Sequence, residues 1–162
     1  MELRHDAFQG LARFASQLDS LIAQKGTPSS RLTIGKVDLV PNFSHTVPGA
    51  AEFIINGRDL DESVMRALRE GCQSLLEEAA AHHGLALRVE EKSWLPPSPC
   101  HTDVIAAFER QAARQRLDYM TMPSGAGHDT QMMARITRAG MIFVPSVKGI
   151  RWGGVGWGRE EI

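Results

Sequence analysis

In the sequence Leu32-Thr33-Ile34-Gly35-Lys36-Val37-Asp38-Leu39-Val40, apolar and polar residues alternate, and the architecture of the chain follows from this run. Alternation with a period of two is typical of a β-strand with one buried face. A second run of this kind covers residues 50–58. Pro41 and Pro48 lie between the two runs and cannot join a hydrogen-bonded ladder. The sequence therefore predicts two strands joined by a loop that contains prolines.

Helical periodicity flanks the two predicted strands on both sides. Residues 6–25 and residues 61–83 carry apolar side chains at helical spacing. These positions are Phe8, Leu11, Ala15, Leu18 and Ile22 in the first helix and Val64, Leu68, Cys72, Leu75 and Ala79 in the second. A third strand is predicted at residues 85–94. The order predicts an α+β fold, an antiparallel sheet with two helices on one face.

The stretch Leu95-Pro96-Pro97-Ser98-Pro99 divides the chain. Prolines this close together exclude regular structure and stiffen the connection. We therefore expect two domains, residues 1–94 and residues 95–162. The second domain is expected to contain a helix at 103–116 capped by Thr102, a helix at 130–138 and a buried strand at 141–144.

Composition excludes several classes of protein. The chain has 162 residues and a formal net charge of −1, so it lacks the basic surface that nucleic-acid binding requires. No apolar run is long enough to span a membrane, and the charged start of the chain lacks the apolar core of a signal peptide. Cys72 and Cys100 form no CxxC pair. We expect a cytoplasmic protein that binds neither nucleic acid nor a membrane.

A second informative stretch is Met122-Pro123-Ser124-Gly125-Ala126-Gly127-His128-Asp129. Small residues leave backbone N–H groups uncovered, so such a loop can approach a ligand closely. Two interpretations stay open here. Asp129 caps the helix that follows, or Gly125, Gly127 and His128 form the wall of a binding pocket.

Three features together carry a family resemblance: Val47-Pro48-Gly49, Arg58 at the end of the second strand, and the loop at residues 124–129. They resemble the hydantoinase/carbamoylase family of zinc-dependent amidohydrolases, which cleave N-carbamoyl amino acids, allantoate and ureidopropionate. The resemblance implies that residues 1–94 form a ferredoxin-like lid and dimerisation domain. It also implies that residues 95–162 are the C-terminal α/β portion of an incomplete catalytic domain.

The resemblance implies roles for five residues. Arg58 matches the arginine that binds the substrate carboxylate, and a guanidinium suits this role because it can hold a carboxylate through two parallel hydrogen bonds. His45 occupies the position of an asparagine that contacts the substrate or the oxyanion, where a histidine can still donate a hydrogen bond. Gly125, Gly127 and His128 match the loop that lines the pocket. In the family the arginine serves the partner subunit, so a homodimer through the lid domain is implied.

The metal ligands of the family have no counterpart in this sequence. The family continues its Pro-Ser strand with Gly-Ile-Ser-His, whose histidine binds the metal, whereas this chain reads Gly149-Ile150-Arg151-Trp152. Neither Arg nor Trp binds zinc. His101-Thr102-Asp103 has the form of a His-x-Asp metal pair, but it lies at a predicted helix start, where Thr and Asp act as caps. We expect no metal ligand, catalytic residue or cofactor in this chain alone, whereas the complete family enzyme uses zinc or manganese.

The sequence is therefore interpreted as a truncated amidohydrolase that keeps elements for substrate-carboxylate binding and dimerisation and is inactive by itself. Its small substrate carries a carboxylate in the complete enzyme. Two alternatives stay open: a non-enzymatic dimerisation or interaction module, and one half of a split enzyme whose other chain supplies the metal site. Metal-dependent release of ammonia, the oligomeric state and a co-purifying zinc-binding partner distinguish these hypotheses.

Overall fold

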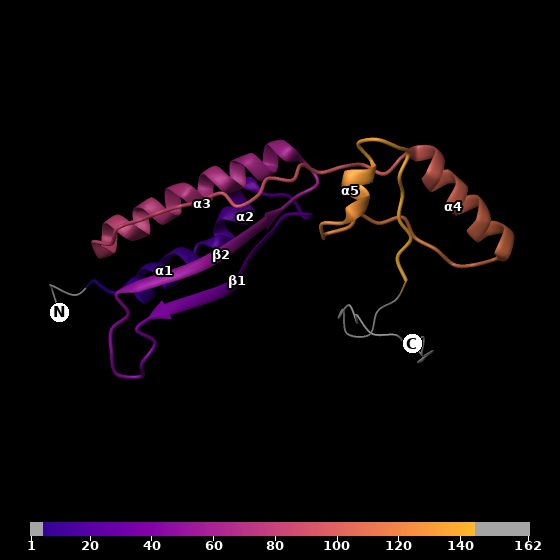
Figure 1. The fold of residues 1–162 in the computed structure, drawn as a ribbon. Helices are drawn as coiled ribbons and strands as arrows, with labels where there is room; N and C mark the ends of the chain where they lie inside the picture. The colour runs from indigo at the N-terminus through magenta and orange to yellow at the C-terminus, as the bar shows by residue number, and fades with distance from the viewer. Residues whose placement is uncertain (1–4, 145–162) are drawn as a thin grey trace.

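The computed structural model describes residues 5–144. The chain has an α+β fold in which a two-stranded antiparallel sheet packs against helices (Figure 1). Strand β1 is Arg31–Val40 and strand β2 is Ala50–Arg58, as the alternating pattern predicts. The strands pair along their whole length, from Arg31 opposite Arg58 to Val40 opposite Ala50.

A β-bulge at Gly35 explains an irregularity in the alternating pattern. The apolar residues of β1 stand at even positions before Gly35, as Leu32 and Ile34 do, and at odd positions after it, as Val37 and Leu39 do. The register shifts directly after Ile34, because one residue of β1 has no partner in β2. The extra residue restores the phase, so the apolar residues on both sides of the bulge lie on the same face of the sheet.

The first predicted helix is divided into α1 (Ala7–Ala15) and α2 (Leu18–Lys25). The side chains of Ser16 and Gln17 both hydrogen-bond to the carbonyl oxygen of Arg13, at 2.9 and 3.3 Å. Such local bonds compete with the helical ladder. The prediction of one continuous helix is therefore wrong at this point.

Capping residues define α1 and the long helix α3 (Glu62–His83). Asp6 caps α1 through Oδ1, which accepts the N–H groups of Phe8 and Gln9 at 3.0 and 3.2 Å. Asp61 caps α3 in the same way, and Gly84 ends α3 with a φ of 63°. A glycine adopts this left-handed conformation without a steric penalty. These three caps confirm the predicted ends.

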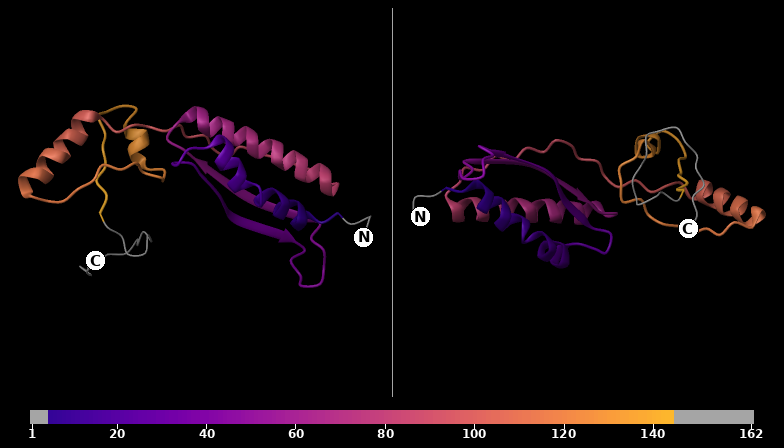
Figure 2. Two further views of the ribbon diagram at one scale, coloured as in Figure 1. Left: turned by 180° about the vertical axis from the view of Figure 1, so that it is seen from behind. Right: turned by 90° about the horizontal axis from the view of Figure 1, so that it is seen from below.

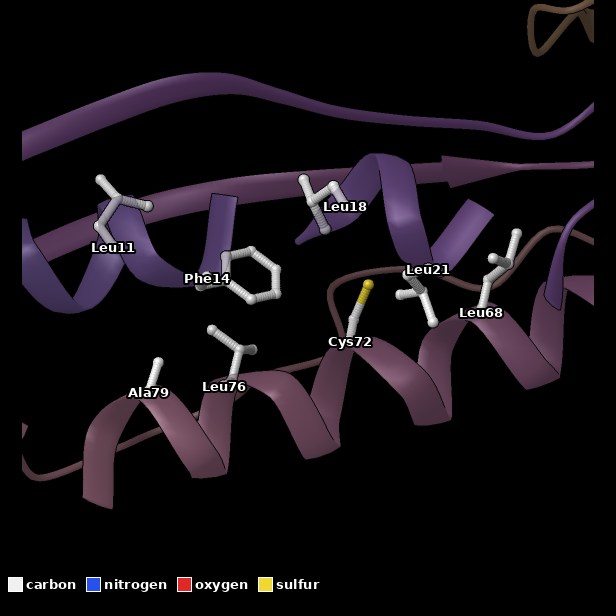
Figure 3. Packing of buried hydrophobic residues seen from close by; sticks show 8 residues of the cluster. All are labelled: Leu11, Phe14, Leu18, Leu21, Leu68, Cys72, Leu76 and Ala79. Carbon is white, nitrogen blue, oxygen red and sulfur yellow. The ribbon is translucent and has the colours of Figure 1, made fainter. Parts of the chain in front are cut away.

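The hydrophobic core lies where α1 and α2 face α3 (Figure 3). Its buried residues are Leu11, Phe14, Leu18, Leu21, Leu68, Cys72, Leu76 and Ala79. The ring of Phe14 also reaches the sheet, with its centroid 5.8 Å from that of Phe53. The predicted face of the first helix is partly wrong, because Phe8 is exposed while Phe14 and Leu21 are buried. Burial also raises the pKa of the Cys72 thiol above its usual value.

The prediction of a third strand at residues 85–94 is wrong. This segment is extended and runs back along α3, but it belongs to no sheet (Figures 1 and 2). A strand needs a neighbouring backbone with which to pair. Two contacts attach the segment to α3: Trp94 Nε1 donates to Glu62 Oε1 at 3.2 Å, and Arg69 pairs with Glu91 at 2.7 Å. The hydrogen bond from Trp94 and the bond and charge of Arg66 lower the pKa of the Glu62 carboxyl.

The second part of the chain contains α4 (Thr102–Gln115) and α5 (Asp129–Met133). His101 caps α4 in place of the predicted Thr102, because its Nδ1 accepts the N–H of Asp103 at 3.2 Å. The second of these helices is shorter than predicted. The apolar run at 141–144 forms no strand, again because the described structure places no strand beside it. The predicted domain boundary at residues 94 and 95 stays a prediction.

No helix within residues 5–144 combines the length and the apolar character needed to cross a bilayer.

Candidate functional site

Arg58 ends β2 and projects toward the glycine loop. Its Nη1 donates to the carbonyl oxygen of Gly125 at 2.5 Å, and its Nε donates to Asn56 Oδ1 at 2.7 Å. Both acceptors are neutral. Within residues 5–144 no carboxylate forms an ion pair with Arg58. Its guanidinium is therefore a cation that only uncharged oxygens hold in place.

The acidic residues that follow Arg58 in the sequence are committed to other contacts. Asp61 caps α3, and Glu62 contacts Arg66 and Trp94. Asp59 Oδ2 accepts the hydroxyls of Thr27 and Ser30, while its Oδ1 accepts the N–H of Asp61. The expectation that a nearby carboxylate could hold Arg58 as a simple ion pair is therefore wrong.

Asp59 fixes the end of β2 from inside the protein. It is only 8% exposed, and its two hydroxyl partners lie at 2.6 and 2.5 Å in the turn before β1. Burial raises the pKa of Asp59, but the hydrogen bonds from Ser30, Thr27 and backbone N–H groups outweigh it and lower the pKa below its usual value. Sequence reasoning missed this network. The available signal was a Thr-x-x-Ser turn followed by an acid at a strand end.

The glycine loop is organised by Ser124 and His128. Ser124 Oγ accepts the N–H of Ala126 at 3.2 Å and lies 2.7 Å from His128 Nε2. The His128 ring meets Phe143 edge-on, with centroids 5.8 Å apart. A Cβ built on Gly125 would contact nothing within 4 Å, so the loop is open on that side. The loop therefore presents a serine hydroxyl and an imidazole beside the guanidinium of Arg58.

His128 also begins α5. It occupies the N-cap position, and its N–H donates to Gln131 Oε1 at 3.2 Å. Gln131 Nε2 in turn donates to the carbonyl oxygen of Pro96 at 3.3 Å. The interpretation of Asp129 as the cap is wrong, because Asp129 is the first residue of the helix itself.

The structure brings four of the five predicted site residues to one groove. Arg58, Gly125, Gly127 and His128 all line a groove of about 2880 Å³. His45 lies elsewhere, in the loop between β1 and β2, where Ser44 Oγ is 3.3 Å from its Nδ1. Eight paired positions of β2 separate that end of the hairpin from Arg58, a span of roughly 26 Å at the usual rise per strand residue. His45 therefore cannot act with Arg58 of the same chain.

The described residues offer no metal site. Between residues 5 and 144, no three His, Cys, Asp or Glu side chains form a group that could hold a metal ion. His101 and Asp103 serve the start of α4, and Asp103 also pairs with Arg138 at 2.9 Å. The chemistry of these donors does not fit a zinc or manganese site.

Comparisons with known proteins connect this geometry with amidohydrolases. The chain is 30% identical over 150 residues to the allantoate amidohydrolase of Escherichia coli strain K12, which covers 93% of this chain and 36% of the relative. It is 29% identical over 151 residues to the N-carbamoyl-L-amino-acid amidohydrolase of Paenarthrobacter aurescens, with 92% and 36% covered. No family model matches the chain.

Solved structures share the same fold. The crystal structure of AtUAH in complex with glyoxylate has a TM-score of 0.85 at 27% identity and matches 93% of this chain and 36% of its own. A hydantoinase/carbamoylase family amidase from Burkholderia multivorans has a TM-score of 0.85, also at 27% identity and with the same coverage. The chain thus spans about a third of the length of these relatives.

Proposed function

Because the chain belongs to the hydantoinase/carbamoylase family of amidohydrolases and spans about a third of its members' length, we propose that it provides their substrate-carboxylate recognition and pairing elements. The substrate class is a small ureido or carbamoyl compound with a carboxylate, such as an N-carbamoyl amino acid, allantoate or ureidopropionate. The fold supports the finer description of residues 1–94 as a lid domain of the ferredoxin-like type.

One observation carries the proposal: Arg58 Nη1 lies 2.5 Å from the carbonyl oxygen of Gly125, which is 67 positions away in the sequence. This contact places a guanidinium beside a loop with a free hydroxyl and an imidazole. A carboxylate that replaced the neutral acceptors would form charge-assisted hydrogen bonds with the same donors. Glyoxylate, the ligand in the AtUAH structure, is itself a carboxylate.

Hydrolysis of the C–N bond requires a second component. The described residues hold no metal site, so the zinc or manganese of the family would have to be bound by residues outside them. We therefore expect the chain alone to release no ammonia from an N-carbamoyl amino acid in the presence of zinc or manganese. Metal-dependent ammonia release by the purified chain would contradict this expectation.

The carboxylate-binding role can be tested directly by calorimetric titration with an N-carbamoyl-L-amino acid. Replacing Arg58 by alanine removes a charged hydrogen-bond donor, and such bonds contribute about 1.5–3 kcal/mol, so we expect affinity to fall roughly 10- to 150-fold. Arg31→Ala is the matched control, because Arg31 lies opposite Arg58 in the sheet but bonds only to the carbonyl oxygens of Pro28 and Ser30. Equal losses in both variants, or none in Arg58→Ala, would refute the role.

A second candidate function is a non-enzymatic dimerisation module. The outer edge of β1 is unpaired, and Val37 and Val40 are exposed on this strand. A free edge can pair with a second copy of the chain. Homodimerisation through residues 1–94 would appear in light scattering at micromolar concentration, and a monomer there would argue against it. Co-purification of a zinc-binding chain from the native cell would instead favour one half of a split enzyme.

A further inference from the structure

Residues 85–94 have the sequence of a strand but no strand partner. Leu85, Leu87 and Val89 alternate with smaller or charged residues. Leu87 is 40% exposed and Val89 51%. Between residues 86 and 94 no backbone group bonds to another backbone group of the described chain. The segment therefore offers an unpaired row of N–H and C=O groups, together with apolar side chains that a neighbour could cover.

The outer edge of β2 is a second unpaired row. β2 is nine residues long and pairs only with β1 in the described sheet. It is connected to residues 85–94 through α3, and both run in the same direction along that helix (Figure 1). Two parallel extended segments joined by a helix, without direct pairing, have the geometry of a split βαβ unit. One strand antiparallel to both would pair with each of them.

The space between these two rows is part of the groove described above. Residues 51–58 of β2 and residues 86–95 line it, and α3 contributes apolar side chains from Leu68, Cys72 and Leu76. A strand in this position would cover α3 with every second side chain. Those side chains need to be apolar and the alternate ones polar.

The chain itself enters at one end of this groove. Ala7 N–H donates to the carbonyl oxygen of Pro48, two residues before β2, at 3.0 Å. The ring of His5 lies 3.2 Å from the carbonyl oxygen of His83, two residues before Leu85. The start of the described chain is thus held between the starts of both unpaired rows.

We propose that this groove binds one β-strand in trans, antiparallel to β2 and to residues 85–94, and so joins them into one continuous sheet. The strand comes from the part of the amidohydrolase that this chain does not span, which in the relatives is about two thirds of the polypeptide. Only this source rests on the proposed function. The binding mode follows from the two free backbone edges.

The test adds a peptide to the full chain and follows amide hydrogen exchange by NMR. The probe is a nine-residue peptide of alternating valine and threonine with a lysine at each end, matched to the length of β2. We expect alternate amides within residues 86–93 and on the outer edge of β2 to exchange at least about 10-fold more slowly. Protection at the outer edge of β1 instead, or no protection at saturating peptide, overturns the proposal.

Two neighbouring proline variants provide the matched control. Successive N–H groups of an extended segment point to opposite edges, so one of Val89→Pro and Glu90→Pro removes a donor aimed at the incoming strand. We expect one variant to bind the peptide at least about 10-fold more weakly and the other to bind like the parent. Identical binding by both variants would overturn the proposal. Unchanged exchange of α3 amides shows that each variant is folded.

The outcomes for the groove and for the proposed function are separable. The carboxylate titration is carried out without peptide and depends on Arg58, whereas strand binding is measured without a carboxylate ligand. Loss of peptide protection together with intact carboxylate binding would refute the strand site alone. The reverse result would refute carboxylate recognition alone.

Discussion

At the scale of single residues, Asp59 has the greatest influence on the site. It is buried directly after Arg58, and its carboxylate bonds to the turn before β1 and to the start of α3. Both segments that flank the hairpin are therefore attached to the end of β2. Arg58 keeps its direction because the residue beside it cannot move.

We predict that Asp59→Asn lowers the free energy of unfolding at neutral pH by about 1–3 kcal/mol, because a neutral amide forms weaker bonds to the same donors. The pKa of Asp59 is lowered in the folded state. Its contribution is therefore present above the unfolded pKa of about 3.9 and is lost as pH falls through the lower folded pKa. Urea denaturation at pH 7 and near pH 3 measures this, and the difference between parent and variant should shrink in acid.

Asp118→Asn is the control for this prediction, since Asp118 is exposed and has no described partner. It should leave the unfolding free energy unchanged within about 0.5 kcal/mol at both pH values. An Asp59→Asn variant as stable as the parent at neutral pH would show that the hydroxyl network contributes nothing to holding the end of β2.

At the scale of elements, the bulge in β1 is the feature most open to experiment. The apolar residues change phase at Gly35, and the bulge compensates for that change. We predict that deletion of Gly35 leaves the pairing of β1 with β2 intact and changes stability by less than about 1 kcal/mol, because the remaining residues then alternate regularly. Urea denaturation and the pattern of protected amides in β1 test this.

Deletion of Thr33 is the matched control. It shortens β1 by the same amount but moves Leu32 out of phase with Ile34, so Leu32 leaves the face that packs on the helices. We expect a loss of about 1.5–3 kcal/mol, the contribution of one buried aliphatic side chain. Equal effects of the two deletions would mean that the phase of the apolar residues does not determine the register.

Local patterns predicted elements well where the partners of an element lie inside the chain. Strands β1 and β2 and helix α3 follow directly from periodicity and from the caps Asp6, Asp61 and Gly84. Residues 85–94 and 141–144 have equally strand-like sequences but form no strand. Periodicity reports which side of a segment is apolar, whereas sheet formation depends on a second backbone that the sequence of the segment does not reveal.

At the scale of the whole molecule, the site joins two parts with very different packing. The sequence identified Arg58 and the glycine loop separately, but no local pattern could show that Arg58 reaches Gly125. Nor could it show that His45 and Arg58 lie at opposite ends of the same hairpin, because that distance depends on pairing register. The candidate site was thus predictable as a set of residues and not as an arrangement.

The packing difference leads to the final prediction. All core residues lie between Leu11 and Ala79, and none of residues 80–144 is buried. Without buried apolar area, little opposes the conformational entropy of this second part. Limited proteolysis of the full chain should therefore cleave first within residues 95–144. Leu68→Ala, which removes a fully buried side chain at a cost of about 2–5 kcal/mol, should accelerate later cleavage inside residues 5–79 and leave the first site unchanged. Equal resistance across both parts would show that the contacts of Arg58 and Gln131 hold them as one cooperative unit.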